Sequence, residues 1–208
     1  MALKKASAAT ELHQVEPRDY GRDLDGLLAQ LRDPDASVRR WAARDLATEP
    51  RAAASLCAQL NQERDASVRV ALFNSASQIG GNTVVQGMLP LLRSEDPGLR
   101  NGAIEVLAGL PDAVAPHIDA LLHDADSDVR IFSVNLLGDL RHPQVPQWLA
   151  MVLTHEAAVN VVGAALEVAA EVGTLQTLPA LRAARARFAS DAYITFAVDL
   201  AVERIESA

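Results

Sequence analysis

Apolar residues recur along this chain at the three- and four-residue spacings that place side chains on one face of an α-helix. Two successive stripes on either side of the turn at 32–35 are Leu24, Leu27, Leu28 and Leu31, followed by Val38, Ala42 and Leu46. Because the turn reverses the chain between them, the two stripes can pack against each other. The pattern predicts a helical hairpin.

The same arrangement returns about every 30 residues, so we expect an all-α, right-handed solenoid of about six two-helix units. First helices are expected near 22–32, 51–62, 82–93, 112–123, 144–154 and 175–189, and second helices near 36–48, 66–79, 97–109, 127–140, 157–171 and 192–205. Helix breakers fall between units at Gly80, Gly81, Pro111, Pro143 and Gly173. We interpret residues 1–18 as a flexible N-terminal tail or docking strand and residues 19–208 as the solenoid. The last unit is expected to act as the C-terminal cap of the solenoid.

A short motif opens each second helix: an acidic residue, an aliphatic residue three positions later, and an arginine directly after it. The copies are Asp35-Val38-Arg39, Asp65-Val68-Arg69, Asp96-Leu99-Arg100 and Asp126-Val129-Arg130, then the weaker Glu156-Val159-Asn160 and Asp191-Ile194-Thr195. The first four aliphatic residues, here called anchors, follow at steps of 30, 31 and 30 residues. The repeat is therefore regular in its first four units.

The motif has a local physical reason. A carboxylate at the N-cap accepts hydrogen bonds from the free amides of the first turn and lies at the positive end of the helix dipole. The arginine falls one turn into the helix, where it can reach the capping acid of its own or the adjacent unit. We expect a structural ladder, made of Asp35, Arg39, Asp65, Arg69, Asp96, Arg100, Asp126 and Arg130. By the same register Glu156 is expected to cap the fifth second helix.

These units resemble HEAT repeats of the short bacterial type, about 30 residues long, which is named for phycobilisome lyases. The resemblance covers residues 22 to 205. It implies the solenoid fold, and it leaves function open, because similar repeats occur in scaffolds, lyase subunits, hydroxylases and DNA repair enzymes.

The composition of the chain limits the kinds of partner that the protein can bind. The hydrophobic set makes up 50% of the chain but aromatic residues only 4%, which is typical of closely packed helices. A formal charge of −8 disfavours nucleic acid, and we interpret the basic cluster Arg182, Arg185 and Arg187 as a solvated helix end. No apolar run approaches the roughly 20 residues of a membrane span, so we expect a cytoplasmic protein.

Catalytic motifs are missing from the pattern. Gly80-Gly81 lacks the Lys-Ser or Lys-Thr of a phosphate-binding loop, and the five histidines never take the spacing of a zinc-protease helix. A single His-Glu pair, His155-Glu156, is too little for a dinuclear iron site. Cys57 lies in an apolar run, so we expect its thiol to be buried and unreactive. We therefore expect no enzyme activity, no metal and no cofactor.

The expected function is a non-catalytic scaffold or adaptor that binds a partner protein on its concave face, with the context of a bacterial regulatory complex implied by resemblance alone. The alternative is a phycobilin lyase-like enzyme or enzyme subunit, in which a tetrapyrrole propionate pairs with Arg40 or Arg44. Nucleic-acid binding is a third possibility. The sequence leaves the oligomeric state open.

Second helices line the concave side of HEAT-like stacks, so the candidate binding residues lie there. Two positions beyond the anchors stand Arg40, Val70, Asn101, Ile131 and Val161, and six positions beyond stand Arg44, Asn74, Glu105, Asn135 and Ala165. Trp41 adds an aromatic residue at the N-terminal end. Two interpretations of Val70, Ile131 and Val161 remain: an apolar strip in the groove, or part of the core.

Overall fold

The computed structural model describes residues 21–207, so the expected tail at 1–18 lies outside the described residues. The first helices of the six units are α1 (Leu24–Gln30), α3 (Ala53–Leu60), α5 (Gly81–Met88), α7 (Pro111–Leu122), α9 (Val145–His155) and α11 (Leu178–Arg187). The second helices are α2 (Ala36–Asp45), α4 (Ala66–Ile79), α6 (Pro97–Ala108), α8 (Ser127–Asp139), α10 (Val159–Val172) and α12 (Ala192–Ser207). Short 3-10 helices are η1 (Leu46–Thr48), η2 (Pro50–Ala52), η3 (Leu89–Arg93) and η4 (Leu175–Thr177).

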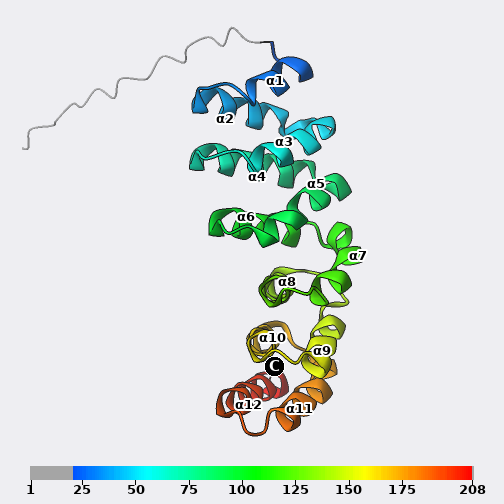
Figure 1. The fold of residues 1–208 in the computed structure, drawn as a ribbon. Coiled ribbons are helices and arrows are strands. Elements are labelled where there is room, and N and C mark those ends of the chain that lie inside the picture. Colours follow the sequence, from blue (N-terminus) through cyan, green and yellow to red (C-terminus); the bar gives the residue numbers. More distant parts are fainter. Residues whose placement is uncertain (1–20, 208) are drawn as a thin grey trace, which may run out of the picture.

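The hairpins stack in chain order, which confirms the predicted all-α solenoid. The second helices form one side of the stack and the first helices the other, and the stack bows so that the second helices lie on its inner side (Figure 1). Gly80 and Gly81 have φ values of 64° and 78°, a backbone conformation that favours glycine, and they join α4 to α5 without a longer loop. No helix within 21–207 combines the length and the apolar composition that crossing a membrane requires.

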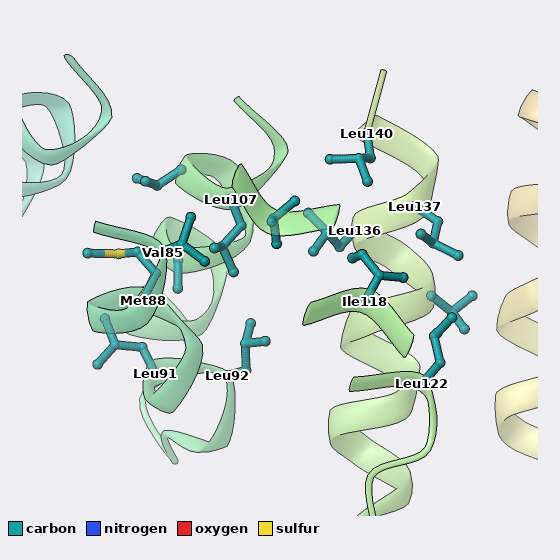
Figure 2. Packing of buried hydrophobic residues seen from close by; sticks show 14 of the residues in the cluster. Val85, Met88, Leu91, Leu92, Leu107, Ile118, Leu122, Leu136, Leu137 and Leu140 are labelled. Atoms are coloured by element: carbon teal, nitrogen blue, oxygen red, sulfur yellow. The ribbon is translucent and has the colours of Figure 1, made fainter. Parts of the chain in front are cut away.

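A continuous apolar core runs between the two layers. Figure 2 shows Val85 of α5 beside Leu107 of α6, and Ile118 of α7 beside Leu136 of α8. All four side chains are fully buried. Because each hairpin buries its apolar face against its neighbours, the units stabilise one another and form one array.

The loop inside each of the first five units is closed by the side chain two residues before the N-cap of the second helix. It accepts a hydrogen bond from the N-cap amide at 2.8–3.2 Å, in the pairs Asp33–Asp35, Glu63–Asp65, Ser94–Asp96, Asp124–Asp126 and Glu156–Ala158. In the first four units the N-cap is an aspartate whose carboxylate accepts a second bond, from the amide two residues later. Each turn thus satisfies the amides that open its helix.

The motif arginines hold the same loops through a second set of hydrogen bonds. Each donates to the backbone carbonyl of that same loop residue, at 2.6–2.8 Å, in the pairs Arg39–Asp33, Arg69–Glu63, Arg100–Ser94 and Arg130–Asp124. This bond lies inside one unit. It ties the second helix to the end of the first.

Three of the four arginines also reach the next unit. Arg39 pairs with Glu63 through two bonds of 2.7 and 2.8 Å, and Arg69 pairs with Asp96 at 2.6 Å. Arg130 meets Glu156 through bonds of 2.8 and 3.2 Å. The ladder therefore uses acids at the loop position as well as at the N-cap, and the sequence pattern missed Glu63 and Glu156 in this role.

Arg100 departs from the ladder. Its guanidinium lies over the ring of Phe132 in the next unit, 5.0 Å from the centroid, and its buried Nε has no hydrogen-bond partner within the described chain. Asp124, the acid at the corresponding loop position, is instead paired with Arg93. A cation–π contact thus replaces the ion pair at this step.

The register expected for the fifth unit is wrong. Glu156 follows the last residue of α9, and Ala158 is the N-cap of α10. The residue three positions after this N-cap is Val161, which is the true anchor of the unit. Val159, the expected anchor, is 42% exposed.

The fifth unit has no arginine of its own to bind the loop carbonyl. Arg187 of α11 takes this place, donating to the carbonyls of Glu156 and Leu153 at 2.9 and 3.0 Å. Arg187 is exposed at the C-terminal end of α11, as expected for a solvated helix end, and it also binds these carbonyls. Its neighbours Arg182 and Arg185 pair with acids on α12.

The pair Arg39–Glu63 gives a test of the ladder. Glu63 is 3% exposed, and the hydrogen bonds from Arg39 lower the pKa of its carboxyl to about 2, from an ordinary value of 4.5. We expect Glu63→Gln to lower the free energy of unfolding by about 3 kcal/mol near neutral pH, because it leaves Arg39 without its buried partner. Denaturant titration at a series of pH values measures this difference.

The pH dependence has a definite sign. A carboxyl whose pKa is lowered by folding stabilises the native state above its unfolded pKa, so the stability difference should narrow as the pH falls from 4.5 toward 2. Glu95→Gln is the control, since Glu95 is exposed in a neighbouring loop. A loss of stability that is equal in both variants would contradict the ladder.

Candidate functional site

The residues expected on the concave face lie on the inner side of the stack, and their side chains differ in solvent exposure. Arg44, Asn74, Asn101, Glu105 and Asn135 are exposed, and Arg40 is half-buried. These positions therefore face solvent along α2, α4, α6 and α8.

The apolar candidates divide between groove and core. Val70 is 59% exposed on α4. Ile131 is half-buried and packs against the core, whereas Val161 is only 1% exposed and belongs to the core. Val70 is thus a groove residue, and Val161 is not.

The corrected register changes which residues of the fifth unit lie in these columns, and the columns continue into the sixth unit. Two and six positions beyond Val161 stand Gly163 and Glu167, and the corresponding residues of the sixth unit are Phe196 and Leu200. Glu167, Phe196 and Leu200 are exposed. Gly163 and Glu167 were missed because the acid at 156 was taken for the N-cap rather than for the loop residue two positions earlier, whereas Phe196 and Leu200 were missed because the columns were not continued into the sixth unit.

A hollow of about 320 Å³ opens between α4 and α6 in the middle of the candidate surface. Its lining includes Val70, Phe73 and Asn74 from α4, with Asn101 and Gly102 from α6. A Cβ atom on Gly102 would lie 2.4 Å from the ring of Phe73, so only glycine allows this ring to lie against α6. The hollow therefore has apolar walls and amide groups at its edge.

The N-terminal end of the surface is cationic and aromatic. The guanidinium of Arg44 lies over the ring of Trp41, 5.2 Å from its centroid, and Trp41 is 40% exposed. The Nε of Arg40, on the same helix, is buried without a hydrogen-bond partner in the part of the chain that the structure describes. Two cations thus stand beside one exposed aromatic ring.

The single cysteine of the chain, Cys57, is buried. Burial raises the pKa of the Cys57 thiol to about 11, so it stays protonated near neutral pH. Residues 21–207 contain no group of three or more His, Cys, Asp or Glu side chains that could hold a metal ion. The arrangement is suited to binding an elongated ligand through cations, amides and apolar walls.

The sequence matches the family model described as HEAT repeats over residues 24–108 and 114–197. The chain belongs to the HEAT-repeat family.

One curated relative of this HEAT-repeat protein is the bilin biosynthesis protein PecE of Mastigocladus laminosus. The two are 30% identical over 152 residues, which cover 71% of this chain and 56% of PecE. The chain therefore spans little more than half the length of this relative.

Two solved structures have similar helical stacks. An engineered protein has 21% identity and a TM-score of 0.46, covering 89% of this chain and 99% of its own. The complex of CpcE and CpcF of phycocyanin lyase from Nostoc sp. PCC7120 has 17% identity and a TM-score of 0.40, covering 93% of this chain and 98% of that chain.

The likeness to PecE corrects two expectations. The sequence alone favoured a non-catalytic scaffold and no enzyme activity, and both are wrong in view of a relative whose name places it in bilin biosynthesis. These expectations relied on short catalytic sequence motifs, and no such motif occurs on this surface.

The division between groove and core can be tested with one substitution at two valines. Val161→Asp buries an unpaired charge and should cost more than about 4 kcal/mol, whereas Val70→Asp should change stability by no more than about 0.5 kcal/mol. Thermal unfolding followed by circular dichroism distinguishes them. Equal effects would show that the corrected register of the fifth unit does not hold.

Proposed function

We propose that this HEAT-repeat protein acts on a bilin, as a phycobilin lyase-like enzyme or as a subunit of one. The observation that carries the proposal is the 30% identity over 152 residues to a bilin biosynthesis protein. The proposal applies to the part that the chain shares with PecE.

The chemistry of the N-terminal half of the concave surface supports this function. A bilin is a linear tetrapyrrole, with a flat conjugated ring system and two propionate carboxylates. Arg40 and Arg44 supply cations for the carboxylates, and arginine is well suited to bind them because its guanidinium is planar and always charged. Trp41, Val70 and Phe73 supply aromatic and apolar contact for the rings.

The shape of the surface suits an elongated ligand. The hollow between α4 and α6 is open to solvent, and the cations of α2 lie on the same inner side of the stack. A tetrapyrrole that lies across α2, α4 and α6 would keep one edge exposed. That edge would stay accessible to a second protein.

Titration with biliverdin, followed by visible absorption and circular dichroism, tests the proposal. We expect a saturable change in absorption and an induced circular dichroism band, because a chiral groove holds the flexible tetrapyrrole in one twist. Arg44→Ala should weaken binding by about tenfold, the effect of losing one charge-assisted contact.

The matched control is Arg141→Ala. Arg141 is an exposed arginine in the loop between α8 and α9, outside the concave columns, so its removal changes the net charge equally. Binding should be unchanged in this variant. Absence of an induced band in the unmodified protein would contradict bilin binding, and equal losses in the two variants would contradict the assigned site.

A further inference from the structure

The last helix carries an exposed apolar stripe that the core does not use. Tyr193, Phe196 and Leu200 of α12 are 51%, 66% and 37% exposed, and their spacing places them on one face of the helix. The core is served by a different face, through Ile194 and Val198. The stripe is therefore not explained by the packing of its own unit.

This stripe joins the exposed face of α10. The hydroxyl of Tyr193 donates to a carboxylate oxygen of Glu167 at 3.0 Å, and a Cβ on Gly163 would lie 3.4 Å from the Tyr193 ring. The Tyr193 ring thus packs against α10 at Gly163, which is buried. The two helices consequently present one surface, the α10–α12 face, made of Glu167, Glu171, Tyr193, Phe196, Leu200 and Glu203.

Negative charge on this face is not neutralised. Glu167, Glu171 and Glu203 have no basic side chain within ion-pair distance in the described part of the chain. Two other acids of α12 do have such partners, because Asp199 pairs with Arg185 and Glu206 with Arg182. Arg182 and Arg185 of α11 are thus paired with α12 acids that lie outside this face.

We propose that the α10–α12 face docks a basic, amphipathic segment of a partner protein, with aliphatic side chains on the Tyr193–Leu200 stripe and lysine or arginine beside the three glutamates. An apolar patch rimmed by charge is typical of an interaction site, and the sign of the rim selects the partner. Acidic segments, nucleic acid and anionic lipid surfaces are repelled. The face lies at the opposite end of the stack from α2 (Figure 1), so the inference goes beyond the proposed bilin site.

The probe is a labelled amphipathic helical peptide of lysine and leucine, with a glutamate and leucine peptide as its charge-reversed counterpart. Fluorescence anisotropy should show binding of the lysine peptide alone, weakening as salt rises. Phe196→Asp and Glu167→Lys should each raise Kd by about tenfold or more, since each removes one of the two complementary features.

Matched controls separate the face from general charge. Leu175 is 68% exposed on η4, against 66% for Phe196, so Leu175→Asp makes the same kind of change elsewhere. Glu95→Lys matches Glu167→Lys in charge. Both controls should bind the peptide as the unmodified protein does, and all four variants should keep the helical circular dichroism spectrum. Equal weakening in variants and controls would overturn the proposal.

Other occupants of the face give different results. A dimer that Phe196→Asp converts to a monomer would show that a second copy covers the face, and tighter peptide binding after removal of residues 1–18 would assign it to the chain's own N-terminal segment. Attachment to vesicles with anionic lipids that Phe196→Asp abolishes would assign it to a membrane. Each of these outcomes overturns the proposal. Biliverdin binding should be unaffected by Phe196→Asp, so failure of the docking surface and failure of the bilin site are distinguishable.

Discussion

The hydrogen bond between each motif arginine and the loop carbonyl six residues before it ties together the two helices of a unit. In the first unit, Arg39 binds the carbonyl of Asp33, whose carboxylate accepts the N-cap amide of Asp35. The loop residue is therefore held at both its backbone and its side chain. Since the arginine continues to Glu63, the same group also sets the position of the second unit against the first. Which columns of α2 face the groove follows from this register.

The locations of these arginine–carbonyl hydrogen bonds explain which features the sequence could predict. Hairpin helices and the four aspartate N-caps follow from local patterns, because capping depends on residues within one turn. The fifth unit was misread because an acid occurs both at the N-cap and two residues before it in three of the six units, and Glu156 fits either position. Only the three-dimensional pairing with Arg130 shows that it is the loop residue. An error of two residues in the anchor then exchanged Gly163 and Glu167 for the buried Val161 and Ala165.

Function was less predictable than fold for a related reason. The residues that repeat most regularly, such as Asp65 and Arg69, hold the loops and helices of the units together. The repeat pattern therefore indicates the fold rather than the function. Groove residues such as Val70 and Asn101 vary from unit to unit and make no motif. The close approach of Phe73 to Gly102 links residues 29 positions apart, which no local pattern captures. The resemblance to short HEAT repeats offered bilin chemistry only as an alternative, and the likeness to PecE is what favours it over a scaffold.

The inner side of the stack changes character from one end to the other. Arg40 and Arg44 stand at the N-terminal end, and Glu167, Glu171 and Glu203 at the C-terminal end. An elongated anionic ligand is therefore attracted to α2 and repelled from α12, which orients it along the groove without a specific contact at its far end. A basic protein segment has the opposite preference. Both ligands would lie on the same side of the array, the bilin at α2 to α6 and the basic protein segment at the opposite end, on α10 and α12. The two surfaces do not overlap, so one chain could bind both ligands at once.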